Sequence, residues 1–136
     1  VEIAEFVGKD NCVIFGLTAP EVKAIKDSGT YSALNIFADN QDIRRAINSL
    51  MDGTWHHNVN EFRVIVDDLL YKNDEYLLLE DFESYRLAQE KINKLYQDRH
   101  LWAKMCLVNI ANSSFFSSDR TIQEYVDDIW KLERVE

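Results

Sequence analysis

The sequence predicts a mainly α-helical fold of about six to seven helices with one or two short strands. Apolar residues recur at helical spacing along most of the chain, and its 136 residues include only four glycines and one proline. One run, Cys12–Gly16, is typical of a strand because it is short and continuously apolar. Glu75–Glu80 is a weaker second candidate. With 46% apolar residues, the chain is expected to bury one core.

Each helix is predicted from its apolar face and its end signals. The predicted helices run from Thr18 to Gly29, Gln41 to Asp52, Asn60 to Tyr71, Asp81 to Tyr96, Arg99 to Asn112 and Ser118 to Trp130. Thr18 and Glu21 form a capping-box pattern, and Gly29 ends that helix. Asp81 and Ser118 are the expected N-caps of two later helices.

Two helices have distinctive apolar patterns. Apolar residues surround most of the helix from Arg99 to Asn112, which predicts a central helix packed on several sides. The helix from Ser118 to Trp130 instead has one apolar stripe, and this stripe is expected to dock on another surface. Its residues are Ile122, Tyr125, Val126, Ile129 and Trp130.

Charge and cysteine content narrow the class of protein. A formal net charge of -9 argues against nucleic acid and anionic membranes as partners. No apolar run approaches the ~20 residues of a membrane helix. Cys12 and Cys106 are too few for a disulfide framework, so we expect reduced, buried thiols in a cytoplasmic protein. The chain lacks a starting methionine and a signal-peptide pattern, and we interpret Val1 as a cut point.

No candidate for catalysis or ligand binding has the spacing that its chemistry needs. His56 and His57 lack a third ligand at metal-site spacing and are expected to face solvent, and His100 is isolated. Neither cysteine has a histidine within local motif distance. The remaining candidates are the acidic pairs Asp67-Asp68, Glu80-Asp81 and Asp127-Asp128 and the glycines Gly8, Gly16, Gly29 and Gly53. The helical acidic pairs are expected on solvated surfaces, and the glycines are too far apart for a phosphate loop. We therefore predict no catalytic, cofactor-binding or metal-binding residues.

Three stretches carry a family resemblance: VEIAEFVGKDNCVIFGLTAPEVKAI, ADNQDIRRAINSLMDGTW and LLEDFESYRLAQEKINKLYQDRHLWAKMCLVNIANSSFFSSDRTIQEYVDDIW. Together they resemble the late part of the α-glucan phosphorylases (glycogen, starch or maltodextrin), where a short helix leads into a strand and a following helix. The most specific part is the ending SSDRTI-x-x-Y-x-x-x-IW, from Ser117 to Trp130. The stretch NQDIRRAINSLMDGTW favours a bacterial source.

The resemblance implies that residues 1–136 are the C-terminal end of the second, pyridoxal-phosphate-binding domain of a GT-B type glycosyltransferase. That domain is Rossmann-like. Such enzymes hold pyridoxal phosphate on a lysine and release glucose 1-phosphate from α-1,4-glucans with inorganic phosphate. In the family the cofactor lysine and the sugar and phosphate segments lie upstream of the position that matches Val1. The resemblance therefore places no active-site residue in this chain.

The same resemblance implies structural roles and partners. Cys12–Gly16 would be the closing strand of a parallel sheet, and the helix over residues 118–130 would cross back to the N-terminal domain. The implied partners are the rest of the phosphorylase chain and, through it, α-glucan and phosphate. The isolated chain is expected to be inactive, to bind no pyridoxal phosphate and to self-associate through uncovered edges and faces. The alternative is a stand-alone helical interaction module without catalysis.

Two positions depart from the family pattern. Ser114-Phe115-Phe116 stands where relatives usually have Gly-Lys-Phe, so an anion contact from that lysine is not expected here. Trp55 stands where Phe is common, which indicates a change in packing.

Overall fold

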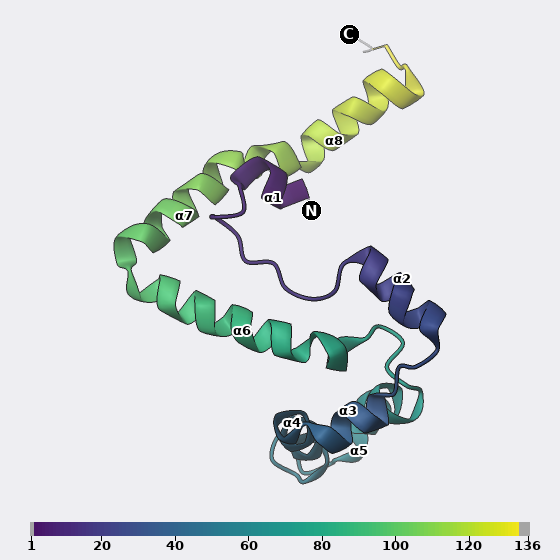
Figure 1. The fold of residues 1–136 in the computed structure, drawn as a ribbon. Coiled ribbons are helices and arrows are strands. Elements are labelled where there is room, and N and C mark those ends of the chain that lie inside the picture. The colour runs from purple at the N-terminus through teal and green to yellow at the C-terminus, as the bar shows by residue number, and fades with distance from the viewer. Residues whose placement is uncertain (1, 134–136) are drawn as a thin grey trace. The chain divides into compact units, whose positions relative to one another are not determined.

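A computed structural model of the chain describes residues 2–133, which are helical with connecting loops. The helices are α1 (Glu2–Val7), α2 (Ala19–Ser28), α3 (Ala33–Asp39), α4 (Gln41–Met51), α5 (Asn60–Val66), α6 (Leu78–Gln97), α7 (Arg99–Asn112) and α8 (Ser118–Glu124). The chain also has two π-helical turns, η1 (Asp67–Tyr71) and η3 (Tyr125–Trp130), and one 3₁₀ turn, η2 (Ser113–Phe116), among the described residues. Figure 1 traces the elements along the chain.

The described residues form two compact units. The first contains residues 2–13 and 91–133, and the second contains residues 14–90. α6 begins in the second unit, and its last turns belong to the first.

The hydrophobic core lies in the second unit, where α3, α4, α5, η1 and the start of α6 meet. Its buried residues are Ala33, Ile43, Ile47, Val66, Leu70 and Leu79. Four of these positions lie on predicted helical stripes, since Ile43 and Ile47 are four residues apart on α4, as are Val66 and Leu70 across α5 and η1. Ala33 and Leu79 lie outside the predicted helices. Half-buried Phe37, Leu50 and Phe82 pack around them.

The first unit is held mainly by α1 against α7 and η2. Val7 and Met105 are buried. Asn109 on α7 donates from Nδ2 to the carbonyl of Asn11 (2.8 Å), which fixes the chain just after α1. Phe6 packs on Phe115, with 3.8 Å between ring centroids.

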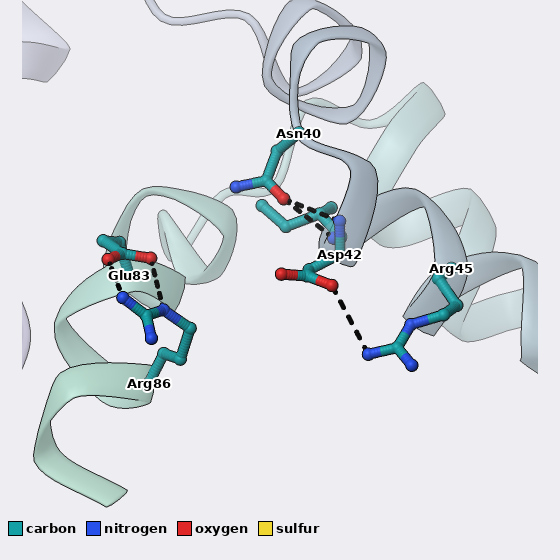
Figure 2. Close-up of polar contacts among 6 residues, drawn as sticks. Asn40, Asp42, Arg45, Glu83 and Arg86 are labelled. Atoms are coloured by element: carbon teal, nitrogen blue, oxygen red, sulfur yellow. Dashed lines mark hydrogen bonds and ion pairs between the residues drawn. The ribbon is translucent and has the colours of Figure 1, made fainter. Parts of the chain in front are cut away.

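Several end signals are confirmed. Glu21 accepts a hydrogen bond from the amide of Thr18 (2.7 Å), as the capping-box pattern predicts, and it also accepts one from the Thr18 hydroxyl (2.6 Å). Gly29 is left-handed (φ 62°) at the end of α2. The start of α4 has a cap that is not among the predicted end signals: Asn40 Oδ1 accepts from the amides of Asp42 and Ile43 (2.9 and 3.0 Å), as Figure 2 shows.

Figure 2 also shows charged pairs on the exposed sides of α4 and α6. Asp42 pairs with Arg45 (3.4 Å), and Glu83 holds Arg86 through both carboxylate oxygens (2.9 and 2.6 Å). Exposed pairs of this kind contribute about 0–1 kcal/mol each to the free energy of unfolding, so the apolar core and the helix caps do more to stabilise the second unit.

The predicted strands are absent from residues 2–133. Cys12–Gly16 is an irregular segment without ladder partners, and Glu75–Glu80 is divided between a loop and the first turn of α6. A strand needs a neighbour to bond its alternate amides and carbonyls, and the described residues provide none beside Cys12–Gly16. The apolar side chains of Ile14 and Phe15 stay exposed (66% and 47%).

Two predicted N-caps are displaced. Ser117 rather than Ser118 caps the last helix, and its Oγ accepts from the amide of Arg120 (3.3 Å). α6 begins at Leu78, so Asp81 lies within its first turn instead of capping it. The amide of Leu79 is satisfied by a carboxylate from the preceding loop, which allows the helix to start earlier.

The expectation of a central α7 with buried thiols is not met within the described residues. Met105 is the only residue of α7 that is buried there. Leu107 and Ile110 are exposed by 65% and 67%. Cys106 is exposed and Cys12 is half-buried, and both are free thiols. The broad apolar pattern predicts burial, but α1 and η2 cover only part of this helix.

Candidate functional site

The two adjacent histidines lie in the loop between α4 and α5. His56 and His57 stack with 4.2 Å between ring centroids. His56 Nδ1 accepts from the amide of Asn58 (3.2 Å) and lies 3.6 Å from Oε2 of Glu61. His100 is exposed on the first turn of α7. Across residues 2–133, no group of three or more His, Cys, Asp or Glu side chains could hold a metal ion.

The acidic pairs on helices face mostly outward, as predicted. Asp68 is exposed and pairs with Lys72 (2.5 Å), and this hydrogen bond raises the pKa of the lysine. Asp67 is half-buried. Asp127 accepts from Gln123 Nε2 (2.8 Å) on the surface of the last helix, and Asp128 is exposed.

A carboxylate that the sequence patterns did not single out is the most buried polar group described. Asp74 is 2% exposed. Its Oδ2 accepts from the hydroxyl of Tyr31 (2.8 Å) and from the amide of Leu79 (2.7 Å). The residue before it, Asn73, accepts from the amide of Ala33 through Oδ1 (2.8 Å) and donates to the carbonyl of Tyr31 (3.1 Å). This Asn73-Asp74 pair joins the starts of α3 and α6.

The environment of Tyr31 follows from this arrangement. Burial and the hydrogen bond to the Asp74 carboxylate raise the pKa of the Tyr31 phenol well above its usual range. A phenolate would face the Asp74 carboxylate and lose the hydrogen bond that it donates, so the neutral form is favoured. Tyr31 therefore acts as a donor in the structure and is poorly suited to be a general base at neutral pH.

A second polar contact holds the apolar segment that precedes α2. Asp81 Oδ1 accepts from the amide of Leu17 (2.7 Å), and Ser84 Oγ accepts from the amide of Gly16 (2.9 Å). Phe15 packs edge-on against Tyr85, with 5.1 Å between ring centroids. The first turns of α6 therefore hold the end of Cys12–Gly16 through side chains, in place of a sheet neighbour.

The last helix has an exposed apolar stripe with a changed spacing. In the π-helical turn η3, residues five apart come onto one side, and the rings of Tyr125 and Trp130 lie 5.7 Å apart. Trp130 is 52% exposed and Ile129 is 63% exposed. Lys131, in a left-handed conformation (φ 51°), ends the turn.

The Ser114-Phe115-Phe116 departure has a structural role. The Arg120 guanidinium lies over the Phe115 ring (3.8 Å to the centroid), and it also pairs with Glu124. Phe116 contacts Phe6 at 5.5 Å between centroids. Aromatic contacts therefore join η2 to α1 and α8 at this place.

Asp74 and Asp81 both accept hydrogen bonds from parts of the chain that are distant in sequence. Within the described part of the chain, no helix is long and apolar enough to cross a membrane.

Comparisons with known proteins agree with the resemblance seen in the sequence. The family model for carbohydrate phosphorylases matches residues 1–132. The glycogen phosphorylase of Bacillus subtilis (strain 168) is 43% identical over 132 residues, which cover 97% of this chain. That of Synechocystis sp. is 37% identical over 136 residues, and the liver form from Ovis aries is 35% identical over 133, covering 99% and 98% of this chain. The chain spans 16% of the length of each of these relatives. The chain belongs to the carbohydrate phosphorylase family.

Proposed function

We propose that the chain is the C-terminal end of the second, cofactor-binding domain of a bacterial α-glucan phosphorylase, and that its role there is structural. The complete enzyme would act in the cytoplasm, cleaving α-1,4-glucans with inorganic phosphate to glucose 1-phosphate. The observation that carries this proposal is the family match over residues 1–132, by a chain that spans only 16% of its relatives.

Pyridoxal phosphate, the cofactor of the complete enzyme, does not fit the residues present. A Schiff-base lysine has to lie in an enclosed site with donors for the cofactor's phosphate. All eight lysines of the chain are exposed, and two of them, Lys23 and Lys72, are paired with carboxylates on their own helices or turns. The catalytic and cofactor-binding residues would therefore lie in the rest of the enzyme.

The exposed apolar segments fit a chain that is covered by the rest of the enzyme. Ile14 and Phe15 would pair in the parallel sheet of a Rossmann-like domain, where Cys12–Gly16 would become the closing strand. The stripe of α8 and η3 would dock on the N-terminal domain. Large exposed side chains such as Trp130 are typical anchors of an interface core, which supports this assignment.

The proposal is tested by grafting. The segment of the Bacillus subtilis relative that matches residues 1–132 is replaced by this chain, and the chimaera is assayed for glucose 1-phosphate formation and for pyridoxal phosphate absorbance. We expect both to be retained, and we expect both to be lost when the segment is deleted. The isolated chain should show neither, so a cofactor band that survives gel filtration of the isolated chain would contradict the structural role.

Self-association of the isolated chain is part of the proposal. Exposed apolar faces on α7 and η3 favour pairing with a second copy when the rest of the enzyme is missing. Sedimentation velocity should show a dimer or higher oligomer at high concentration. A monomer at every concentration, together with weak binding of a hydrophobic dye, would contradict it.

A stand-alone helical interaction module is the second candidate. One observation favours it, namely that residues 14–90 have a buried cluster of their own. A reading frame that continues upstream into a cofactor-lysine segment would exclude this candidate, and a start codon directly before Val1 would support it.

A further inference from the structure

The loop between η1 and α6 has an unusual backbone. Asn73, Asp74 and Leu77 have positive φ angles of 60°, 45° and 59°. Residues other than glycine rarely adopt this conformation; asparagine and aspartate tolerate it best, and for leucine it is unfavourable. The left-handed Leu77 therefore shows that the surrounding contacts hold the loop on this path.

The contacts that hold the loop are few and well defined. Asp74 bonds Tyr31 and the amide of Leu79, while Asn73 bonds the amide of Ala33 and the carbonyl of Tyr31. Within the loop, the amide of Leu77 donates to the carbonyl of Asp74 (2.9 Å). Both side chains also bond Tyr31, Asn73 at its carbonyl and Asp74 at its hydroxyl, so Tyr31 links the acceptor of the α3 amide to the acceptor of the α6 amide.

The loop also has room to move. A hollow of about 490 Å³ adjoins the loop and is lined by residues that include Leu69, Asp74 and Tyr76. A second hollow of about 230 Å³ is lined by residues that include Tyr31, Asp74 and Leu77. Ile43 and Ile47 of the buried cluster line neither hollow, whereas Leu77 of the loop is itself buried (2% exposed).

We propose that Asn73–Leu77 is a latch with two states. In the closed state, which the structure shows, Asp74 and Asn73 hold the starts of α6 and α3. In the open state all of these tethers are released together, the three left-handed residues relax, and the loop moves into the adjoining hollows. The amides of Ala33 and Leu79 then open to solvent, while Ile43 and Ile47 stay packed in the buried cluster. Backbone strain favours the open state and the shared hydrogen bonds favour the closed one, which gives the loop two alternatives.

The latch is tested by amide hydrogen exchange. The exchange is followed by NMR on the full chain, under conditions where opening is at equilibrium. The amides of Ala33 and Leu79 have different side-chain acceptors, so separate fraying would give them separate opening free energies. The latch requires one common value, lower than that of Ile47 in the core. Unequal values, or values equal to that of Ile47, would overturn the proposal.

The variant Tyr31→Phe tests the coupling without touching either amide. Loss of one hydroxyl bond should speed exchange at Ala33 and Leu79 by a common factor of about 3 to 10, with Ile47 unchanged. The matched control is Tyr71→Phe, at a tyrosine that is 73% exposed, and it should change none of the three. Acceleration at only one amide, no acceleration at either, or an equal change at Ile47 would each refute a concerted latch. These readouts do not depend on phosphorylase activity and can fail while the family assignment stands.

Discussion

Replacing Gly16 by alanine adds one methyl group beside the carboxylate of Asp81, which already accepts a hydrogen bond. Gly16 has φ +89°, and a β-carbon there would lie 2.8 Å from Oδ2 of Asp81 and 3.1 Å from its Cγ. The Asp81 carboxylate cannot simply turn away, because its Oδ1 accepts from the amide of Leu17 at 2.7 Å. The substitution should therefore strain the backbone and weaken a charge-assisted hydrogen bond at the same time.

Gly29 provides the matched control. It also has positive φ (+62°), but no atom lies within 4 Å of the β-carbon that alanine would add. Gly29→Ala should cost about 1–2 kcal/mol in backbone strain, reduced by about 0.4–1 kcal/mol from the stiffer unfolded chain. Gly16→Ala carries the same two effects and also loses part of a charge-assisted bond worth about 1.5–3 kcal/mol. Because Asp81 is half-buried, we expect the lower part of that range, and a total loss of about 2–3 kcal/mol.

Urea unfolding followed by the fluorescence of Trp55 measures the loss within residues 14–90. Trp102 and Trp130 are replaced by phenylalanine in every variant, so that Trp55 is the only tryptophan. In an Asp81→Ala background the clash and the hydrogen bond are both absent, and Gly16→Ala should then cost no more than Gly29→Ala. Equal losses for the two glycine variants in the presence of Asp81 would refute the reasoning.

Three further predictions follow from the contacts described. The pKa of Tyr31 is raised in the folded chain, so the unfolded chain loses this proton first, and the free energy of unfolding should fall as pH rises above about 10. The urea midpoint of Tyr31→Phe should therefore decline less steeply between pH 9 and 11 than that of the unsubstituted chain. An equal slope for the two chains would contradict this origin. Asn40→Ala removes the acceptor of two amides at the start of α4 and should lower stability by about 1 kcal/mol, whereas Asn48→Ala, at an exposed mid-helix position, should not lower it. Ile129→Glu and Trp130→Ala should each weaken self-association at least about tenfold in sedimentation, since burying either side chain contributes about 1.5–3 kcal/mol; unchanged association would place the contact elsewhere.

Local signals in the sequence located most of the helices. The Thr18–Glu21 capping box, the break at Gln97-Asp98 and the stripes of α4 and α5 act over three to four residues, so they can be recognised without tertiary information. α3 was missed because seven residues are too few to show a clear period. The π-helical turns were missed because a pattern of apolar spacing does not distinguish them from the end of an α-helix.

The candidate site was less predictable than the helices. Asp74 is followed by Glu75 and lies in a polar stretch, so its sequence context suggests a solvated loop residue. The Asn73-Asp74 pair was the one local sign of a structured loop, since these residue types tolerate left-handed backbone and accept hydrogen bonds from nearby amides. The partner could not be inferred, because Tyr31 lies 43 residues away.

The sequence by itself determined the helical character of this protein, its acidic surface and, through the ending from Ser117 to Trp130, its resemblance to a phosphorylase. These depend on local spacing, on composition and on residue identity. The tertiary structure alone decided that Cys12–Gly16 is held by Asp81 and Ser84 instead of a ladder, and that Asp74 joins two helix starts. The physical reason is that a strand and a buried carboxylate are both defined by partners distant in sequence, whereas a helix satisfies its backbone hydrogen bonds within itself.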